Sequence, residues 1–250
     1  NIRGLSPEMN SVTIDGDRIP SAEAETRSIQ LDLVPSDMIQ TIEVNKVVTA
    51  DMDADAIGGS VNLLTKSAPV GRRIIAELGS GYNFISEKPQ VKAYLMYSDR
   101  YLNNKLGMTL SGSYDDNKLG SDNNELEWDM EGNNIYVSDF QVRQYYLERL
   151  RQSYSASFDY EINKNHKLKF SALYNRRKDW ENRYRLQYKD IEYDEGELVI
   201  GEIRREVKAS VKDNKYARLE DQTMMDFSLK GDHHIGHLQA DWKVSYSKSS

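Results

Sequence analysis

The amino-acid sequence predicts an all-β chain, in which a small α+β unit precedes the antiparallel strands of a transmembrane β-barrel. Seven runs beyond residue 73 alternate apolar with polar side chains at a period of two, as strands with one apolar face do. Each run is close to the roughly 9 to 11 residues that a tilted strand needs to cross hydrocarbon. No window approaches the roughly 18 to 20 apolar residues of a transmembrane helix, which excludes a helical membrane protein.

The average composition points the other way. Apolar residues make up 38% and charged residues 29% of the chain, and the mean hydropathy is −0.72, values typical of a soluble hydrophilic protein. Sixteen Tyr against five Phe is nevertheless the mixture of alternating strands, which average hydropathy cannot detect. The absence of cysteine excludes a disulfide framework and a thiolate metal site. The net charge of −7, with basic residues scattered among acids, argues against a nucleic-acid partner.

The first 70 residues read as short strands joined by turns. Val12–Ile14 precedes Asp15-Gly16, a pair that suits a tight hairpin turn because it tolerates positive φ. Residues 32–38 predict a capped short helix or a turn, and residues 39–48 alternate as a strand. A glycine pair then leads into a strand at residues 61–65. Residues 67–71, with Pro and Gly, predict a linker, so we divide the chain into residues 1–70 and 71–250.

The seven alternating runs are joined by connections that alternate in length, except that the first connection, at residues 86–89, is short where a long one is expected. The runs cover residues 74–84, 91–98, 105–114, 153–162, 167–174, 223–230 and 238–246. Short connections separate the second run from the third, the fourth from the fifth and the sixth from the seventh, whereas residues 115–142 and about 175–217 predict long polar loops. A membrane meander produces this alternation, with turns on the periplasmic side and loops outside. We therefore expect the apolar faces to meet lipid and the charged faces to line the lumen.

The first 70 residues carry motifs that resemble the plug domain of TonB-dependent receptors. Residues 2–4 resemble the family's R-G element, residues 12–18 its V-x-x-D-G hairpin and residues 42–44 its I-E-V strand. Residues 56–66 are similar to the family's closing A-I-G-G-x-V-N-L-x-T-K element, which directly precedes the barrel. Residues 49–55 resemble a branch in which carbohydrate uptake has been described alongside iron-complex uptake.

The resemblance implies the rear part of a plug domain, followed by the first strands of an antiparallel transmembrane β-barrel of about 22 strands. It departs from the family pattern in that the signal peptide, the TonB box and the front of the plug are missing, so we expect a fragment. The implied function is active import of a scarce, bulky nutrient, a ferric siderophore or a carbohydrate, across the outer membrane of a Gram-negative bacterium. The implied partners are TonB, outer-membrane lipid and lipopolysaccharide, and the nutrient itself.

Two sets of candidate site residues follow. A structural or gating role in the plug is assigned to Arg3, Gly4, Asp15, Gly16, Glu43, Gly58, Gly59 and Asn62. Trp128 and Tyr136, in the first long loop, are candidates for substrate binding, although aromatic residues are equally expected in the girdles of a barrel.

Other groups of polar residues read as structural. His233, His234 and His237 invite a metal site, but adjacent strand residues point to opposite faces, so we predict none. The acidic residues of 115–131 lack the spacing of a calcium loop. The basic residues of 176–185, which resemble a nucleic-acid surface, read better as rim residues near lipopolysaccharide phosphates.

The sequence shows no catalytic motif, so we predict neither an enzyme nor a cofactor. The competing interpretation is a soluble extracellular β-rich carbohydrate-binding module, in which the apolar faces would pack on one another as the core of a sandwich. Dependence on detergent separates this alternative from the transporter.

Overall fold

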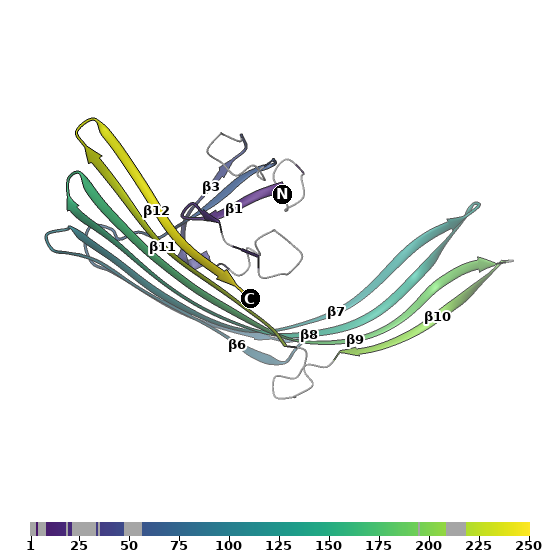
Figure 1. Ribbon diagram of the computed structural model, residues 1–250. Coiled ribbons are helices and arrows are strands. Elements are labelled where there is room, and N and C mark those ends of the chain that lie inside the picture. Colours follow the sequence, from purple (N-terminus) through teal and green to yellow (C-terminus); the bar gives the residue numbers. More distant parts are fainter. Residues whose placement is uncertain are drawn as a thin grey trace.

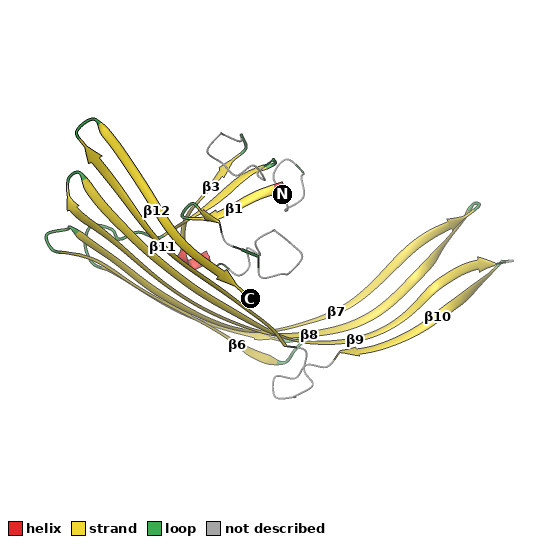
Figure 2. Ribbon diagram, viewed as in Figure 1, coloured by secondary structure: helices red, strands yellow, loops and turns green. Residues whose placement is uncertain are grey.

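The computed structural model describes residues 4, 9–18, 20–21, 34, 36–47, 57–194, 196–208 and 219–250. Within them the chain forms two sheets, one of four strands in the order β2-β1-β4-β3 and one of eight strands. The eight-stranded sheet runs β12-β11-β9-β8-β7-β6-β5, and β10 pairs with β9 beside this path. Figure 2 shows that strands dominate and that one short helical turn accompanies them. Within the described residues, no helix is long and apolar enough to cross a membrane.

The four-stranded sheet is mixed. Its strands are β1 (Asn10–Ile14), β2 (Asp17–Arg18), β3 (Ile39–Asn45) and β4 (Gly59–Thr65), and a 3₁₀ turn, η3 (Ser36–Met38), precedes β3. β4 lies parallel to β1 and antiparallel to β3. The predicted hairpin turn is confirmed, since Asp15 and Gly16 have φ of 50° and 78° and join antiparallel β1 and β2. Of the helix or turn predicted over residues 32–38, the part at Ser36–Met38 is a 3₁₀ turn; residues 32, 33 and 35 lie outside the described residues.

The eight-stranded sheet is antiparallel throughout, and each predicted run lies in one of its strands. The strands are β5 (Arg73–Asn83), β6 (Lys88–Tyr101), β7 (Leu106–Glu131), β8 (Asn134–Asn163), β9 (His166–Asp194), β10 (Glu197–Lys208), β11 (Leu219–Ile235) and β12 (Leu238–Ser249). Figure 1 shows this sheet curving around the four-stranded one, while β7 to β10 continue past it as two long hairpins.

The two long polar loops were predicted wrongly. Residues 115–142 continue β7 and β8 to a turn at residues 132–133, and most of residues 175–217 form the upper part of β9 and all of β10. β7 and β8 pair from Leu106 to Glu131, with one register shift after Glu127. A polar residue on an alternating strand is compatible with the ladder, because antiparallel pairing satisfies the backbone whatever the side chains are. The sheet therefore has eight strands where we predicted seven.

The two faces of the large sheet differ in chemistry. On the face that contacts the four-stranded sheet, which we call the inner face, Ser98, Thr109 and Ser153 are buried. On the opposite, outer face, large apolar side chains are exposed, Leu95 by 57% and Leu78 by 88%. The predicted alternation of faces is thus confirmed. Some inner residues are nevertheless apolar and buried, among them Tyr94 and Met96. Leu173 and Met224, also on this face, are buried in one cluster with Ile14, Met38 and Leu63 of the small sheet and its 3₁₀ turn, which gives the two sheets a shared core.

Candidate functional site

Cross-strand pairing arranges the inner face of the large sheet in rows, because directly paired residues lie on the same face. One row contains only hydroxyl side chains across six strands: Ser98, Thr109, Ser157, Ser171, Ser228 and Ser245. Two of these, Ser98 and Thr109, hydrogen-bond to each other at 2.9 Å between their hydroxyl oxygens. Below this hydroxyl row lie Lys169, Lys230 and Lys243, each the direct partner of the next.

The predicted plug residues that the structure describes are largely brought together. The Asn62 amide oxygen accepts hydrogen bonds from the Gly16 amide at 2.9 Å and the Thr13 hydroxyl at 3.0 Å, while its amide nitrogen donates to Glu43 at 3.1 Å. Asn62 therefore connects three strands of the small sheet. Its side-chain amide can do so because it carries both hydrogen-bond donors and an acceptor.

Asp15 holds the end of β4. Its carboxylate accepts from the Thr65 backbone amide at 3.0 Å and from the Thr65 hydroxyl at 2.6 Å. Gly58 fits closely against β1, because a Cβ there would overlap the Asn10 side chain, and Gly59 has φ of 137°, which favours glycine. Gly4 has φ of 72° and no neighbouring atoms around its Cβ position, while Arg3 lies outside the described residues.

The turn between β1 and β2 is also the place where the small sheet meets the lysines of the large one. Lys169 lies 3.6 Å from the Asp15 carboxylate and Lys230 lies 3.6 Å from that of Asp17, which also pairs with Lys243. The ammonium groups of Lys230 and Lys243 donate to the carbonyl oxygens of Asp15 and Gly16 as well. The sequence predicted that lysines such as Lys169 face the lumen and that Asp15 and Gly16 form the turn. It did not predict that the lysines meet Asp15 and Asp17, because nothing in their spacing shows it.

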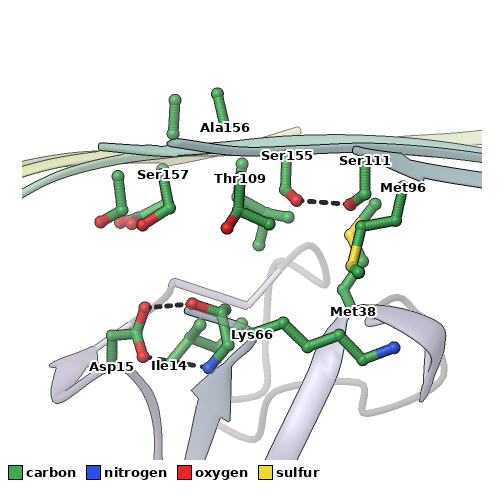
Figure 3. A pocket seen from close by; sticks show the side chains of 15 residues that line it. Ile14, Asp15, Met38, Lys66, Met96, Thr109, Ser111, Ser155, Ala156 and Ser157 are labelled. Carbon is green, nitrogen blue, oxygen red and sulfur yellow. Dashed lines mark hydrogen bonds between the residues drawn. The ribbon is translucent and has the colours of Figure 1, made fainter. Parts of the chain in front are cut away.

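A narrow pocket separates the two sheets beside this contact. Figure 3 shows the hydroxyls of Thr109, Ser111 and Ser155 pointing from the large sheet toward Asp15 and Lys66 of the small one. Ser111 and Ser155 hydrogen-bond to each other at 2.7 Å between hydroxyl oxygens. The contact between the two sheets is therefore mixed, with these hydroxyls beside apolar residues such as Met38 and Met96.

Farther along the inner face, above the small sheet, the wall is charged and its charges are paired. The Arg149 guanidinium binds the Asp179 carboxylate through two hydrogen bonds of 2.8 and 2.6 Å. Arg177 donates to Glu220 at 3.1 Å, and Arg183 to Glu206 at 2.9 Å. With Tyr145, Leu147 and Glu181, several of these residues line an open hollow. Burial and the nearby Glu181 raise the pKa of Tyr145.

Trp128 and Tyr136, the candidate substrate residues, lie on strands instead of in a loop. Trp128 is on β7, directly after the register shift, and is 64% exposed. Tyr136 is on β8, and its ring centre lies 6.1 Å from that of Tyr193 on β9. Burial, followed by the carboxylates of Asp129, Glu131 and Glu192, raises the pKa of Tyr136. The structure does not bring the two candidates into one pair, since Trp128 pairs with Val137.

The three histidines considered as metal ligands do not lie around one point. His233 and His234 are on β11 and His237 is in the following turn. Instead, the Nδ1 atom of His233 lies 3.0 Å from that of His166 on β9, and the Trp242 indole donates to His233 Nε2 at 2.8 Å. Since an indole N–H only donates, Nε2 accepts and the neutral His233 carries its proton on Nδ1. Among the described residues, no group of three or more His, Cys, Asp or Glu could hold a metal ion.

Residues 1–60 match the family described as the TonB-dependent receptor plug domain. Among solved structures, the chain is similar to the ferric enterobactin receptor PfeA in complex with BCV-L6, with a TM-score of 0.52 and 13% identity. Two mutants of this receptor from Pseudomonas aeruginosa, in complex with enterobactin, match with TM-scores of 0.51 and 0.52 and identities of 13% and 14%.

All three comparisons cover 100% of this chain and 42% of the other, so the chain spans less than half the length of the receptors it matches. At this identity the likeness concerns the fold: a plug domain enclosed by the strands of a receptor barrel. Residues 1–60 thus match the plug-domain family of TonB-dependent receptors, and over its whole length the chain shares its fold with part of a ferric enterobactin receptor.

Proposed function

We propose that residues 1–70 are the rear part of a plug and residues 71–250 the first barrel strands of a transporter that imports a scarce, bulky nutrient across the outer membrane of a Gram-negative bacterium. The supporting observation is that a charged inner face encloses the small sheet while the outer face is apolar and exposed. A bilayer offers no hydrogen bonds, so strands that meet lipid must pair into a closed cylinder with an apolar exterior. A wide cylinder needs a plug to close it.

The outer face argues against the soluble binding module. A sandwich would bury its apolar faces between two sheets at about 10 Å spacing. Here Phe84 is 85% exposed, Val244 66% and Leu238 64%, and the small sheet lies on the opposite face. Purification of the full-length protein with and without detergent tests the point: a monodisperse protein in plain buffer would support the soluble module and contradict the transporter.

Energy for import would come from TonB, which we propose pulls on a part of the plug outside residues 1–250. Many contacts of the small sheet with the wall are polar, such as those of Asp15 and Asp17 with the lysines, and water can replace polar partners when the sheet is displaced. Outer-membrane lipid would cover the apolar band, and the basic residues Arg176 and Lys178 would lie near lipopolysaccharide phosphates. These two cations share the carboxylate of Asp221, at 2.6 and 3.9 Å.

The nutrient would bind on the inner wall above the plug. We propose a ferric siderophore as the first candidate, because the matched receptor is named for ferric enterobactin, and a carbohydrate as the second. The hairpins formed by β7 to β10 carry Trp128, Tyr136 and Tyr145, whose rings could stack on either ligand.

Growth and uptake by a deletion strain provide the test. A strain without the full-length gene should lose uptake of one ligand class, and a plasmid copy should restore it only when TonB is present. Unchanged uptake of ferric siderophores and of oligosaccharides would contradict the proposal. Tyr145→Ala should weaken binding of the identified ligand, whereas Tyr82→Ala, on the exposed face of β5, serves as the matched control.

A further inference from the structure

Three positive charges stand side by side on the inner wall. Lys169 on β9 is the direct cross-strand partner of Lys230 on β11, which is in turn the partner of Lys243 on β12. Like charges directly opposite one another destabilise a sheet. The one carboxylate in the same row, Asp159, lies 2.6 Å from Arg100 and is therefore already neutralised. We call these three residues the lysine row.

The turn between β1 and β2 supplies the missing negative charge. Asp17 is 2% exposed, and its carboxylate contacts both Lys230 and Lys243. Asp15 lies 3.6 Å from Lys169. The backbone adds two acceptors, since Lys230 donates to the Asp15 carbonyl and Lys243 to the Gly16 carbonyl, the latter at 2.8 Å. Two carboxylates and two carbonyl groups on three successive residues thus contact three ammonium groups.

The turn is prepared for this role by its own geometry. Positive φ at Asp15 and Gly16 turns the two carbonyl groups away from the small sheet, where the lysines reach them. The Asp15 carboxylate is fixed by Thr65 at the end of β4, and Gly16 by Asn62. The Asp15 carboxylate and the Gly16 backbone are therefore held in place within the small sheet.

We infer that the Asp15–Asp17 turn is the counter-ion of the lysine row and that this contact is an electrostatic latch for the plug. When the turn is absent, the three adjacent ammonium groups repel one another and the large sheet is less stable. This repulsion favours the return of the plug. The inference rests on the proposed function only because it requires a plug that can move away from the barrel wall.

The test measures plug release without nutrient and without TonB. The full-length receptor is placed in a planar lipid bilayer, and spontaneous openings are counted as steps of potassium chloride conductance. Asp17→Asn keeps the shape of the side chain but removes the carboxylate that contacts Lys230 and Lys243, so openings should become about tenfold more frequent. Asp241→Asn, which removes an exposed carboxylate two residues from Lys243, is the control and should leave the frequency unchanged.

A second variant that restores the balance of charge distinguishes a counter-ion from a contact that only adds binding energy. Lys243→Met added to Asp17→Asn should return the openings toward the wild-type frequency, because it relieves the repulsion in the row. If the contact merely adds binding energy, the double variant will open at least as often as the single one, which would overturn the inference.

A single substitution covers the case in which Asp17→Asn does not fold. Lys230→Met leaves two lysines for two carboxylates and should open no more often than the wild type, whereas an ordinary contact predicts more openings. Each variant is first shown to form a folded barrel by circular dichroism. Neither nutrient nor TonB is present in this measurement, so its result does not depend on the import proposal. A variant that takes up nutrient normally but lacks the expected change in opening frequency contradicts the latch and not the import proposal.

Discussion

The indole of Trp242 on β12 covers Gly231 on β11, its direct cross-strand partner on the outer face. A Cβ atom at Gly231 would overlap the indole ring. The same indole donates a hydrogen bond to His233, which fixes the position of the ring over Gly231. Glycine is required at this position by a neighbour on another strand and not by its own backbone, which no pattern within β11 indicates.

Gly231→Val should therefore destabilise the protein by about 1 to 3 kcal/mol, the usual cost of overpacking. Trp242→Ala in the same chain should recover most of the loss, since it removes the overlapping ring. Urea unfolding of the receptor in lipid vesicles measures both. A double variant no more stable than Gly231→Val alone would show that the close approach is not the cause.

The outer face should reject charge more strongly than the inner one. Leu110→Arg places a cation on the exposed apolar face of β7 and should cost about 2 to 4 kcal/mol if that position lies near the middle of the bilayer. Ser113→Arg, on the half-buried inner face of the same strand, should cost less because the lumen is polar. Equal losses in membrane assembly would contradict the assignment of the two faces.

Thr109 illustrates why the inner control must be chosen from the structure. Parity alone makes Thr109→Arg a mild substitution, but its side chain is 4% exposed and hydrogen-bonded to Ser98 beneath the small sheet. We expect this variant to displace the plug, which increased cleavage of residues 1–70 by protease would report.

The paired charges of the upper wall should contribute unequally. Asp179→Ala removes the carboxylate between Arg149 and Arg177 and leaves two guanidinium groups in a largely buried site, so we expect a loss of about 2 to 4 kcal/mol. Glu202→Ala breaks an exposed pair with Arg204, and exposed pairs contribute about 0 to 1 kcal/mol. Unfolding midpoints compare the two, and a similar loss for both would contradict the distinction.

Tyr136 should ionise later than an ordinary tyrosine. Partial burial and three nearby carboxylates favour the neutral phenol, which raises its pKa above 10.0. In an alkaline absorbance titration, the component lost in Tyr136→Phe should appear above the main tyrosine transition. Asp129→Asn should move that component toward lower pH. A component at or below the ordinary value would show that the carboxylates do not act on this ring.

Sequence reasoning located the strands that cross the predicted membrane better than the hairpins beyond them. Within each of these segments, apolar residues such as Leu110 recur at every second position along the strand. This periodicity identified each run. Beyond Tyr114 both faces of β7 carry polar residues, for example Asp115 on the inner face and Asp116 on the outer one, so the period-two signal disappears although the strand continues. β10 was missed for this reason, although Ile203 and Val207 keep the period.

The candidate site was predicted only in part. Asp15, Gly16, Glu43 and Asn62 were named from motifs within the small sheet; in the structure Asn62 hydrogen-bonds to Gly16 and Glu43, whereas Asp15 accepts hydrogen bonds from Thr65. The lysine row and the pairing of Arg149 with Asp179 were missed, since they depend on which residues face one another across strands.

The sequence by itself determined the seven alternating strand segments, their two faces and the turn at Asp15-Gly16, because side-chain alternation and positive φ are local properties of the chain. Only the tertiary structure decided that Lys169, Lys230 and Lys243 lie in one row and that Asp17 neutralises two of them. The physical reason is register: a shift of one residue would turn each lysine to the opposite face, and register is fixed by pairing between segments far apart in the chain.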